Sequence, residues 1–319
     1  MKESMRRQLL ICLVGPTAVG KTALSCELAR AFDGEVISCD SRQIYRGMDV
    51  GTAKPTMEER RDVPHHMIDV ADPREDYSAA RYAAEATQAV ERVLARGRLP
   101  IVTGGTGLYL RALVTGMYGD AGDGGASGSG GAARIYWQAY LEMYGEERLL
   151  EALRAVDGET AGRLHQRDHV RVVRALEVFT ETGVTMAEHL RRSVRRPRRF
   201  ETLTIGLRRD RTRLYGRIDA RVDEMMSLGF LEEVRRLRDA GVPTDVPAMN
   251  AIGYRELSEV LDGQATLTEA VARIKQATRR YAKRQITWFA HQWDAEWLDA
   301  GVGNLLAAST EIVEKSILS

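Results

Sequence analysis

The stretch GPTAVGKT at residues 15–22 limits the folds open to this chain more than any other feature. It has the spacing G-x-x-x-x-G-K-T and separates the apolar run LLICLV from the helix-forming run ALSCELARAF. A glycine-rich turn between a buried strand and a helix directs backbone N–H groups, and the positive end of the helix, toward a bound anion. We therefore expect a phosphate-binding loop, in which Lys21 adds a point charge and the Thr22 hydroxyl is placed to bind Mg²⁺.

The first third of the chain alternates strand and helix patterns. Short apolar runs at 35–39 and 99–105 predict buried strands, and the alanine-rich run at 80–97 predicts a helix. Such alternation indicates a parallel α/β sheet. Because ligands collect at the carboxyl ends of parallel strands, we expect the segments that follow the strands to meet at one site. These segments are 15–22, 40–43 and 104–109.

The middle of the chain departs from this alternation. A low-complexity run, GDAGDGGASGSGG at 119–131, predicts a flexible linker, and the patterns from 134 to 194 are helical throughout. The run ETLTIGL at 201–207 predicts a strand that returns to the sheet, and the later segments, notably 211–240 and 265–292, are helical. We expect an α/β core with an inserted all-helical domain. The first part of the core, the insert and the completion of the core are expected over 1–116, 117–200 and 201–319.

Composition excludes several classes of protein. With 44% hydrophobic and 29% charged residues, the chain is typical of a soluble globular protein. A formal net charge of +1 means that affinity for nucleic acid must come from local basic patches, which occur at 191–199, 235–238 and 278–285. No apolar run approaches the ~18 residues of a membrane span. The N-terminal apolar run leads straight into the glycine-rich loop, so we interpret it as a strand and not as a signal peptide.

The cysteines point to a reducing compartment. There are three, without a C-x-x-C pair, which argues against both a disulfide framework and a zinc site. We expect Cys12, Cys26 and Cys39 to be small buried side chains in a cytoplasmic protein.

Local sequence leaves alternative roles open for two polar residues. Asp40 follows a predicted strand, where it suits a general base or a magnesium ligand, but Asp40 and Ser41 also suit the cap of a turn or helix. Thr106 lies among the glycines of GGTGLYL, which let a ligand approach the backbone closely. The same run also suits a tight turn between a strand and a helix.

Three further segments have both a structural and a functional interpretation. The adjacent His65 and His66 suggest a metal site, but an extended segment would point them to opposite sides, and no third ligand is suitably spaced. Arg217 and Arg221 share one helix face, which suits either ligand binding or a solvated charged surface. The basic and aromatic residues at 281–293 suit either nucleic-acid binding or core packing.

Together these stretches resemble one family, the bacterial tRNA dimethylallyltransferases, also called tRNA isopentenyltransferases. The resemblance runs nearly end to end, and the combination is far more specific than a phosphate-binding loop alone. It rests on GPTAVGKTALS, ISCDSRQIYRGMDVGTAKP, HHMIDVADP, YSAA, VTGGTGLYLRAL, DHVRVVRALEVFTETG, NAIGYRE and TRRYAKRQITWF. Between Gly116 and Arg134 the chain departs from the family's shorter, proline-containing connection, and we carry over no contact there.

The resemblance implies transfer of a dimethylallyl group from dimethylallyl diphosphate to N6 of an adenine adjacent to the anticodon in tRNA, forming N6-dimethylallyladenosine. It implies a P-loop-kinase-like core whose loop holds a departing diphosphate. The expected partners are tRNA and dimethylallyl diphosphate, with Mg²⁺ as cofactor, no membrane and a cytoplasmic monomer. The alternatives are a P-loop small-molecule kinase, an AMP isopentenyltransferase, and an RNA-binding protein whose loop is a nucleotide switch.

The resemblance also assigns roles to individual residues. Asp40 is expected to be the general base, Thr106 to contact the reacting groups, and Lys21 and Arg221 to contact the diphosphate. The expected diphosphate-binding residues are Gly15, Pro16, Thr17, Ala18, Val19, Gly20, Lys21 and Thr22, with Thr22 also the metal ligand. The expected tRNA-contacting residues are Asp40, Ser41, Arg42 and Gln43, and Val170, Arg171, Val172, Val173 and Arg174.

Overall fold

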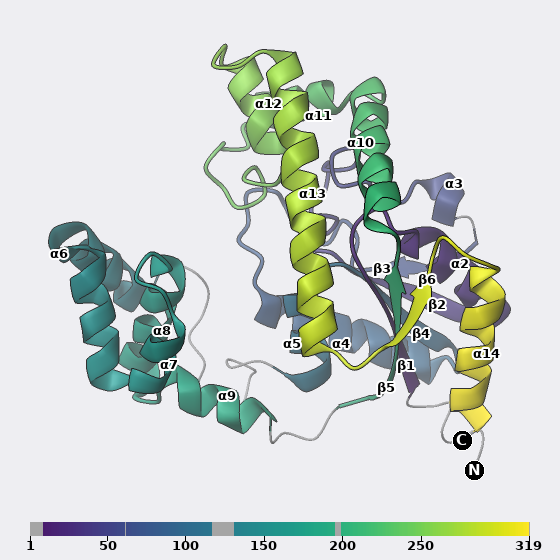
Figure 1. Cartoon of the computed structure of the whole chain (residues 1–319), viewed down its shortest axis with the longest axis horizontal. Helices are drawn as coiled ribbons and strands as arrows, with labels where there is room; N and C mark the ends of the chain where they lie inside the picture. The colour runs from purple at the N-terminus through teal and green to yellow at the C-terminus, as the bar shows by residue number, and fades with distance from the viewer. Residues whose placement is uncertain (1–8, 61, 117–130, 195–198, 319) are drawn as a thin grey trace. The chain divides into compact units, whose positions relative to one another are not determined.

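The computed structural model describes residues 9–60, 62–116, 131–194 and 199–318. These residues form two compact units, whose elements are labelled in Figure 1. Unit 1 comprises the described parts of Met1–Tyr77, Glu85–Leu110 and Phe200–Ser319, and unit 2 those of Ser78–Ala84 and Arg111–Arg199.

Unit 1 is built on a parallel sheet of six described strands, in the order β3-β2-β4-β1-β5-β6. Every residue of β1 and β2 is buried, as expected for strands covered on both faces. Because β4 pairs with both β1 and β2, the segments that follow these three strands emerge side by side at one edge. The strands are β1 (Leu9–Val14), β2 (Gly34–Cys39), β3 (His65–His66), β4 (Leu99–Gly104), β5 (Glu201–Arg208) and β6 (Glu296–Asp299).

Helices cover this sheet. Leu9, Ile11 and Leu13 of β1 share one apolar core with residues of α2, α10 and α14. Since successive strand side chains alternate, Leu10 and Cys12 are buried on the opposite face. The helices wholly in unit 1 are α2 (Lys21–Ala31), α3 (Met57–Arg60), α10 (Arg211–Ser227), α11 (Phe230–Asp239), α12 (Tyr254–Leu261), α13 (Leu267–Gln292) and α14 (Leu305–Leu318). Two helices have residues in both units, α4 (Ala79–Ala95) and α5 (Gly107–Thr115).

Unit 2 has helices and no strand among its described residues. Those wholly within it are α6 (Ala132–Val156), α7 (Gly158–Arg163), α8 (His169–Thr182) and α9 (Met186–Val194). They enclose a small apolar core of Leu149, Leu150, Leu153, Ala161, Val172, Val173, Ala175 and Leu176. Gly145, at a φ of 80°, interrupts α6.

The parallel α/β core with inserted helices confirms the predicted fold class. The stretch predicted to be helical over 211–240 is two helices, because Gly229 takes a φ of 90° between α10 and α11. The predicted linker at 119–131 lies outside the described residues, except for Gly131. None of the described helices is both long enough and apolar enough to cross a lipid bilayer.

Candidate functional site

The glycine-rich loop joins β1 to α2 at the carboxyl edge of the sheet. A Cβ on Gly15 would lie 2.5 Å from the carbonyl oxygen of Leu207 on β5, so a side chain is excluded there. Ala18 takes a φ of 62°, a left-handed conformation that is uncommon for a residue other than glycine. Arg217 of α10 donates from Nε to the Ala18 carbonyl oxygen at 2.8 Å. The loop is therefore fixed by the neighbouring strand on one side and by α10 on the other.

Lys21 begins α2 and turns its ammonium group back onto the loop. Its Nζ donates to the carbonyl oxygens of Gly15 at 3.0 Å and Pro16 at 2.8 Å. Burial of the ammonium group lowers the pKa of Lys21 to about 8, while the carboxylate of Asp40 opposes this shift and Arg221 adds to it. A bound anion would therefore favour the charged form of Lys21.

Asp40 follows β2, and its carboxylate organises the turn that comes after it. Oδ1 accepts hydrogen bonds from the backbone N–H groups of Arg42 at 2.8 Å and Gln43 at 3.4 Å, which is the turn cap that the sequence left as an alternative. Thr106, which follows β4, is tied to this turn because its Oγ1 accepts from the backbone N–H of Ser41 at 3.0 Å. The structure thus brings Asp40 and Thr106 together.

Two residues of α13, Gln285 and Tyr281, belong to this site although sequence reasoning missed them. Gln285 is buried; its Oε1 accepts from the backbone N–H of Thr17 at 2.8 Å, and its Nε2 donates to the carbonyl oxygen of Gly105 at 2.9 Å. Burial, and then the charge of Asp40, raise the pKa of Tyr281 to about 12, so its phenol stays protonated at neutral pH. Their i, i+4 spacing is the sequence signal that could have indicated a shared helix face.

The charged face of α10 is partly solvated, since Arg217 and Asp223 are exposed, whereas Arg221 is half-buried. Burial of the guanidinium, and then the charge of Arg217, lower the pKa of Arg221, which lines the same cavity as Lys21 and Asp40. Arg217 braces the loop through its bond to Ala18, and both Arg217 and Arg221 line the cavity. The acidic residues of this helix bridge it to α13 through two ion pairs, Asp219 with Arg279 at 2.5 Å and Asp223 with Lys275 at 2.6 Å.

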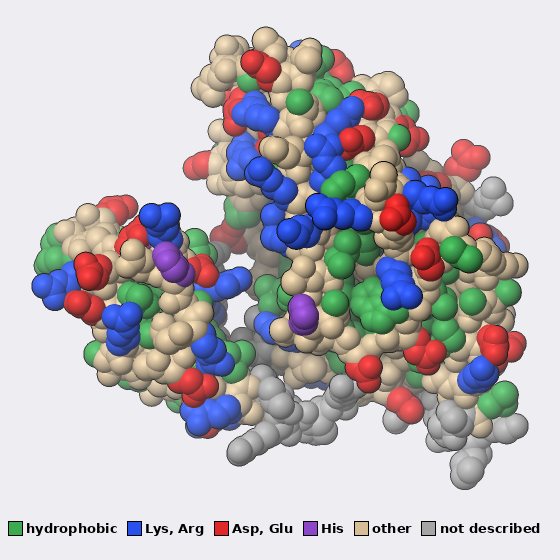
Figure 2. Space-filling view, in the orientation of Figure 1, with side chains coloured by type: hydrophobic (Ala, Val, Ile, Leu, Met, Phe, Trp, Pro, Cys, Tyr) green, Lys and Arg blue, Asp and Glu red, His purple; other side chains and the backbone are tan. Residues whose placement is uncertain are grey.

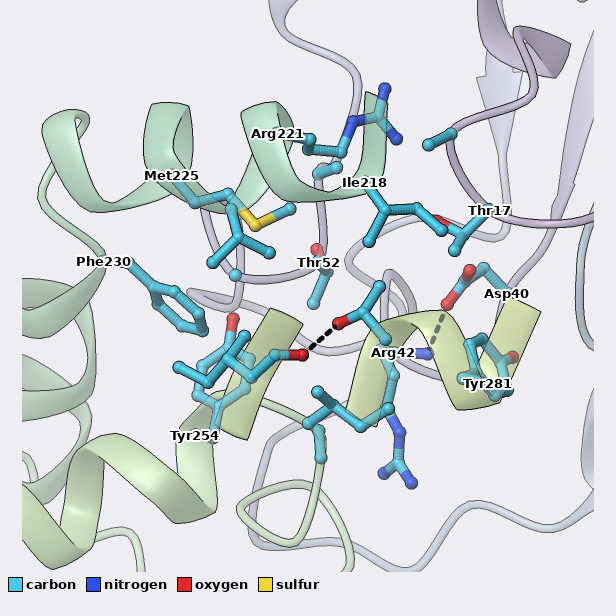
Figure 3. Close-up of a pocket in the computed structure, with 18 of the residues that line it drawn as sticks. Thr17, Asp40, Arg42, Thr52, Ile218, Arg221, Met225, Phe230, Tyr254 and Tyr281 are labelled. Carbon is cyan, nitrogen blue, oxygen red and sulfur yellow. Dashed lines mark hydrogen bonds between the residues drawn. The ribbon is translucent and has the colours of Figure 1, made fainter. Parts of the chain in front are cut away.

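These residues line a cavity with two adjoining lobes, and Asp40 and Arg221 belong to both. The anion lobe, of about 190 Å³, contains Lys21 and Thr22. The apolar lobe, of about 330 Å³, is bounded by α10 and α13. Figure 3 shows the apolar lobe, with Thr17 and Asp40 toward one end of the view and Phe230 and Tyr254 toward the other. Its apolar lining residues are Ala18, Ile218, Val222, Met225, Phe230, Ala251, Ile252, Tyr254 and Ile274.

The outer face of α13 carries a basic surface, and Lys and Arg side chains gather over this helix in Figure 2. Phe289, in contrast, is buried, so the basic and aromatic residues of 281–293 divide between the surface and the core. A second basic run, 191–199, lies partly outside the described residues, at 195–198. The residues that line an open hollow on α13, of about 600 Å³, are Arg280, Lys283, Arg284, Thr287, Trp288, His291 and Gln292.

The expected tRNA-contacting segment Val170–Arg174 lies at the start of α8 in unit 2. Val170 is 70% exposed, but Val172 and Val173 are buried in the core of this unit. Because a helix turns about a third of a circle per residue, five consecutive side chains cannot face one partner. The expectation of contact through the whole segment therefore does not hold for the side chains of Val172 and Val173.

The histidine pair forms β3 and has structural partners. His66 Nε2 lies 2.6 Å from Glu35 Oε2, and His65 Nδ1 lies 2.9 Å from the carbonyl oxygen of Val63. Within the part of the chain that the structure describes, no group of three or more His, Cys, Asp or Glu side chains is placed to hold a metal ion.

Comparison with known sequences gives one consistent result. The model of the family described as IPP transferase matches residues 43–292. The chain is 46% identical over 312 residues to a tRNA dimethylallyltransferase of Thermomicrobium roseum, a match that covers 98% of this chain and 92% of the relative. It is 48% identical over 295 residues to a tRNA dimethylallyltransferase of Symbiobacterium thermophilum, covering 91% of this chain and 89% of the relative.

Solved structures agree with the sequence matches. The full-length tRNA isopentenylpyrophosphate transferase of Bacillus halodurans superposes with a TM-score of 0.69 at 39% identity, over 98% of this chain and 95% of that one. A eukaryotic dimethylallyltransferase acting on tRNA superposes with a TM-score of 0.82 at 29% identity, over 98% of this chain and 79% of that one. The similarity therefore extends over nearly the whole chain.

Proposed function

This chain belongs to the IPP transferase family, and from that premise we propose that it transfers a dimethylallyl group to tRNA. The proposed donor is dimethylallyl diphosphate, and the proposed acceptor is N6 of an adenine adjacent to the anticodon. The observation that carries the proposal is the junction of two lobes at Asp40 and Arg221, one lined by Lys21 and the other by apolar side chains. A diphosphate joined to a short apolar chain matches this pair of lobes in charge and polarity.

The anion lobe is the proposed site of the diphosphate. Negative charge grows on the diphosphate as it departs, so cations held in advance of the reaction stabilise the transition state. Burial lowers the pKa of both Lys21 and Arg221, so a bound anion stabilises the charged form of each. Arg217 contributes indirectly, because its bond to the Ala18 carbonyl oxygen holds the loop in the conformation that surrounds the anion.

Asp40 is the proposed general base. The exocyclic amine of adenine is a weak nucleophile and must lose a proton as it attacks. In the proposed step the N6–C1 bond forms, the bond between C1 and the diphosphate oxygen breaks, and the N6 proton moves to the carboxylate. The backbone N–H groups of Arg42 and Gln43 both donate to Oδ1, which fixes the orientation of the carboxylate and directs Oδ2 as the proton acceptor.

Thr106 and Tyr281, whose side chains interact with each other near Asp40, are proposed to orient the reacting groups. Thr106 is fixed by the Ser41 backbone N–H. Tyr281, with its pKa raised to about 12, stays a hydrogen-bond donor through the neutral range. An adenine within a stacked loop cannot reach this cavity, so we propose that the target base is extruded from the stack and brings its N6 beside Asp40.

The oxygen chemistry of the anion lobe fits Mg²⁺. Magnesium binds oxygen ligands and commonly keeps several waters, taking only one or two ligands from protein with the rest from phosphate. Thr22 lines this lobe, and so does Thr103, whose Oγ1 is buried without a hydrogen-bond partner among the described residues. Thr22 and Thr103 would hold the ion or its waters, and the ion would neutralise charge on the diphosphate.

The dimethylallyl group is proposed to occupy the apolar lobe next to the diphosphate. Ile218, Val222 and Met225 of α10 and Ile274 of α13 line this lobe and offer apolar surface. The proposal also includes a cytoplasmic monomer. Cys12, Cys26 and Cys39 are all buried thiols, as suits a reducing compartment.

One assay tests the proposal against its alternatives. The protein is incubated in nucleotide-free buffer with Mg²⁺, dimethylallyl diphosphate, and either a tRNA or AMP, and the acceptor is analysed by mass spectrometry. We expect one added C5H8 unit on an anticodon-loop adenosine and no modified AMP. Modification of AMP alone would support the AMP isopentenyltransferase, and a phosphorylated product that forms only when ATP is added in a parallel reaction would support the kinase.

A further inference from the structure

A buried carboxylate, Glu233 of α11, lies behind the residues that line one end of the apolar lobe, because it bonds to Gly51 and Tyr254. Glu233 is only 1% exposed. Its Oε2 accepts from the backbone N–H groups of Asp49 at 2.9 Å and Val50 at 2.7 Å. Its Oε1 accepts from the backbone N–H of Gly51 at 3.1 Å and from the hydroxyl of Tyr254 at 2.6 Å. Hydrogen bonds to an ionised acceptor are the strong ones, so this group of four fixes α11, the turn at Asp49–Gly51 and the start of α12 together.

Phe230 fills the space that these segments enclose. It begins α11 one turn before Glu233, and it is buried. A Cβ on Gly51 would lie 2.0 Å from Phe230 Cε2, and a Cβ on Gly253 would lie 2.5 Å from its Cε1. The ring therefore lies between two glycine backbones, with its centroid 5.0 Å from that of Tyr254 in an edge-to-face contact. Gly51 and Tyr254 cannot retreat without breaking their hydrogen bonds to Glu233.

Gly51, Phe230 and Tyr254 all line the apolar lobe. Figure 3 shows the side chains of Phe230 and Tyr254 at the end of the view opposite Thr17 and Asp40. In the proposed function, on which this inference rests, the diphosphate lies at the loop and the prenyl chain extends into the lobe. We infer that Phe230 is the stop that limits the length of the transferred chain, and that Glu233 is the positioning residue that holds this stop in place.

The packing explains why such a stop would be strict. A donor chain long enough to reach Phe230 would have to displace this ring from close-packed surroundings, which do not yield easily. Glu233 can be tested separately from the lining residues. Glutamine has a single acceptor oxygen, and its NH₂ group would face N–H donors. Glu233→Gln therefore loosens the wall without changing any side chain that lines the lobe.

The test compares two donors, dimethylallyl diphosphate and the ten-carbon geranyl diphosphate, on the same tRNA. For each protein we measure kcat/KM with both donors, and mass spectrometry distinguishes the five- and ten-carbon products. The wild type should strongly prefer the five-carbon donor. In Phe230→Ala and Phe230→Leu the ratio of ten- to five-carbon kcat/KM should rise by about tenfold or more, since a few methylene groups in a pocket discriminate on this scale. Glu233→Gln should raise the ratio by a smaller factor.

Two controls on α11 separate this effect from a loss of folded protein. Glu232→Gln changes an exposed neighbour whose partner is Arg235, and Val234→Ala changes a buried residue outside the lining. Destabilisation lowers both rates together, so both controls should keep the wild-type ratio. If Phe230→Ala does not fold by circular dichroism, Phe230→Leu and Glu233→Gln decide the question.

Three outcomes have distinct meanings. An unchanged ratio in folded Phe230→Leu and Glu233→Gln overturns the inference. Efficient ten-carbon transfer by the wild type also overturns it. If the wild type transfers no five-carbon group to any tRNA, the proposed function fails instead.

Discussion

The side-chain oxygen of Gln285 accepts a hydrogen bond from the backbone N–H of Thr17 at 2.8 Å, across 268 residues of sequence. The nitrogen of the same amide donates to the Gly105 carbonyl oxygen at 2.9 Å. One side chain of α13 thus sets the separation between the phosphate-binding loop and the turn that carries Thr106. A helix near the end of the chain thereby shapes the proposed diphosphate site.

Replacing Gln285 with methionine keeps the length of the side chain and removes both bonds. The Thr17 N–H and the Gly105 carbonyl would be left without these partners, at a cost of about 1–3 kcal/mol for each buried group. If part of this free-energy cost raises the activation free energy, kcat/KM should fall about ten- to hundredfold in steady-state kinetics. Gln264→Met, at an exposed position before α13, serves as the matched control. Wild-type kinetics in Gln285→Met would show that the bridge does not matter for catalysis.

Lys21→Ala tests the charge at the diphosphate. We expect turnover to fall by about 10²–10³, the usual effect of losing one group that stabilises developing negative charge. Affinity for tRNA should change little, because the proposed RNA contacts lie elsewhere. Lys315→Ala removes an exposed lysine that pairs with Glu311 and should have no effect. Near wild-type turnover in Lys21→Ala would remove the basis for placing the diphosphate in the loop.

The KM for the donor should depend on pH because burial lowers the pKa of Lys21 from 10.5 to about 8. Above about pH 8 the free protein loses the charge that the diphosphate needs, so the KM for the donor should rise by about tenfold per pH unit. Lys21→Met, which cannot titrate, should lack this rise. In the same window the unfolded chain binds more protons than the folded one, so this group makes the free energy of unfolding increase with pH. A flat donor KM in the wild type from pH 7 to about 9.5 is the result that contradicts this reasoning.

Salt dependence tests the proposal that Arg171 of unit 2 contacts RNA. Arg171 and Arg148 are both exposed, and each pairs with an acidic residue three positions away. Arg171→Gln should reduce the slope of log affinity for tRNA against log salt concentration by about 0.7–0.9, the value for one phosphate contact, whereas Arg148→Gln should leave the slope unchanged. Equal effects of the two substitutions would refute a specific contact at Arg171. Arg174 is a poorer choice, because its removal would leave the buried Glu177 without its cation.

The sequence could predict the parts of the site that follow from local pattern and topology. The loop at 15–22, Asp40 and Thr106 each follow a strand, and a parallel sheet brings the ends of its strands to one edge. No information on side-chain packing is needed for that expectation. The structure does bring these segments together.

The other parts of the site depend on how helices far away in the sequence pack against the loops. Gln285 and Glu233 each bond backbone groups more than 180 residues away, so their roles depend on the register of α13 and α11 against the loops. No local pattern encodes that register. The same holds for the segment Val170–Arg174. Which of its side chains are buried and which are exposed depends on how α8 packs, and only the structure shows this. Sequence patterns therefore locate a site more readily than they identify the residues that hold it in shape.

The central claim is that Asp40 takes the proton from N6. Asp40→Asn keeps the size of the side chain and an oxygen for the Arg42 and Gln43 N–H groups, but it cannot accept a proton. Two other roles for Asp40 predict different results for Asp40→Asn. A magnesium ligand would lose donor affinity, with partial rescue by added Mg²⁺, and a turn cap would lose about 1 kcal/mol or less of stability with its chemistry intact.

The most direct measurement is the single-turnover rate constant of Asp40→Asn, with saturating dimethylallyl diphosphate and tRNA, alongside donor affinity and a melting curve. We expect the rate constant to fall by about 10²–10⁴, the contribution of a general base, while donor affinity and melting temperature stay close to those of the wild type. A single-turnover rate constant equal to that of the wild type would contradict the claim.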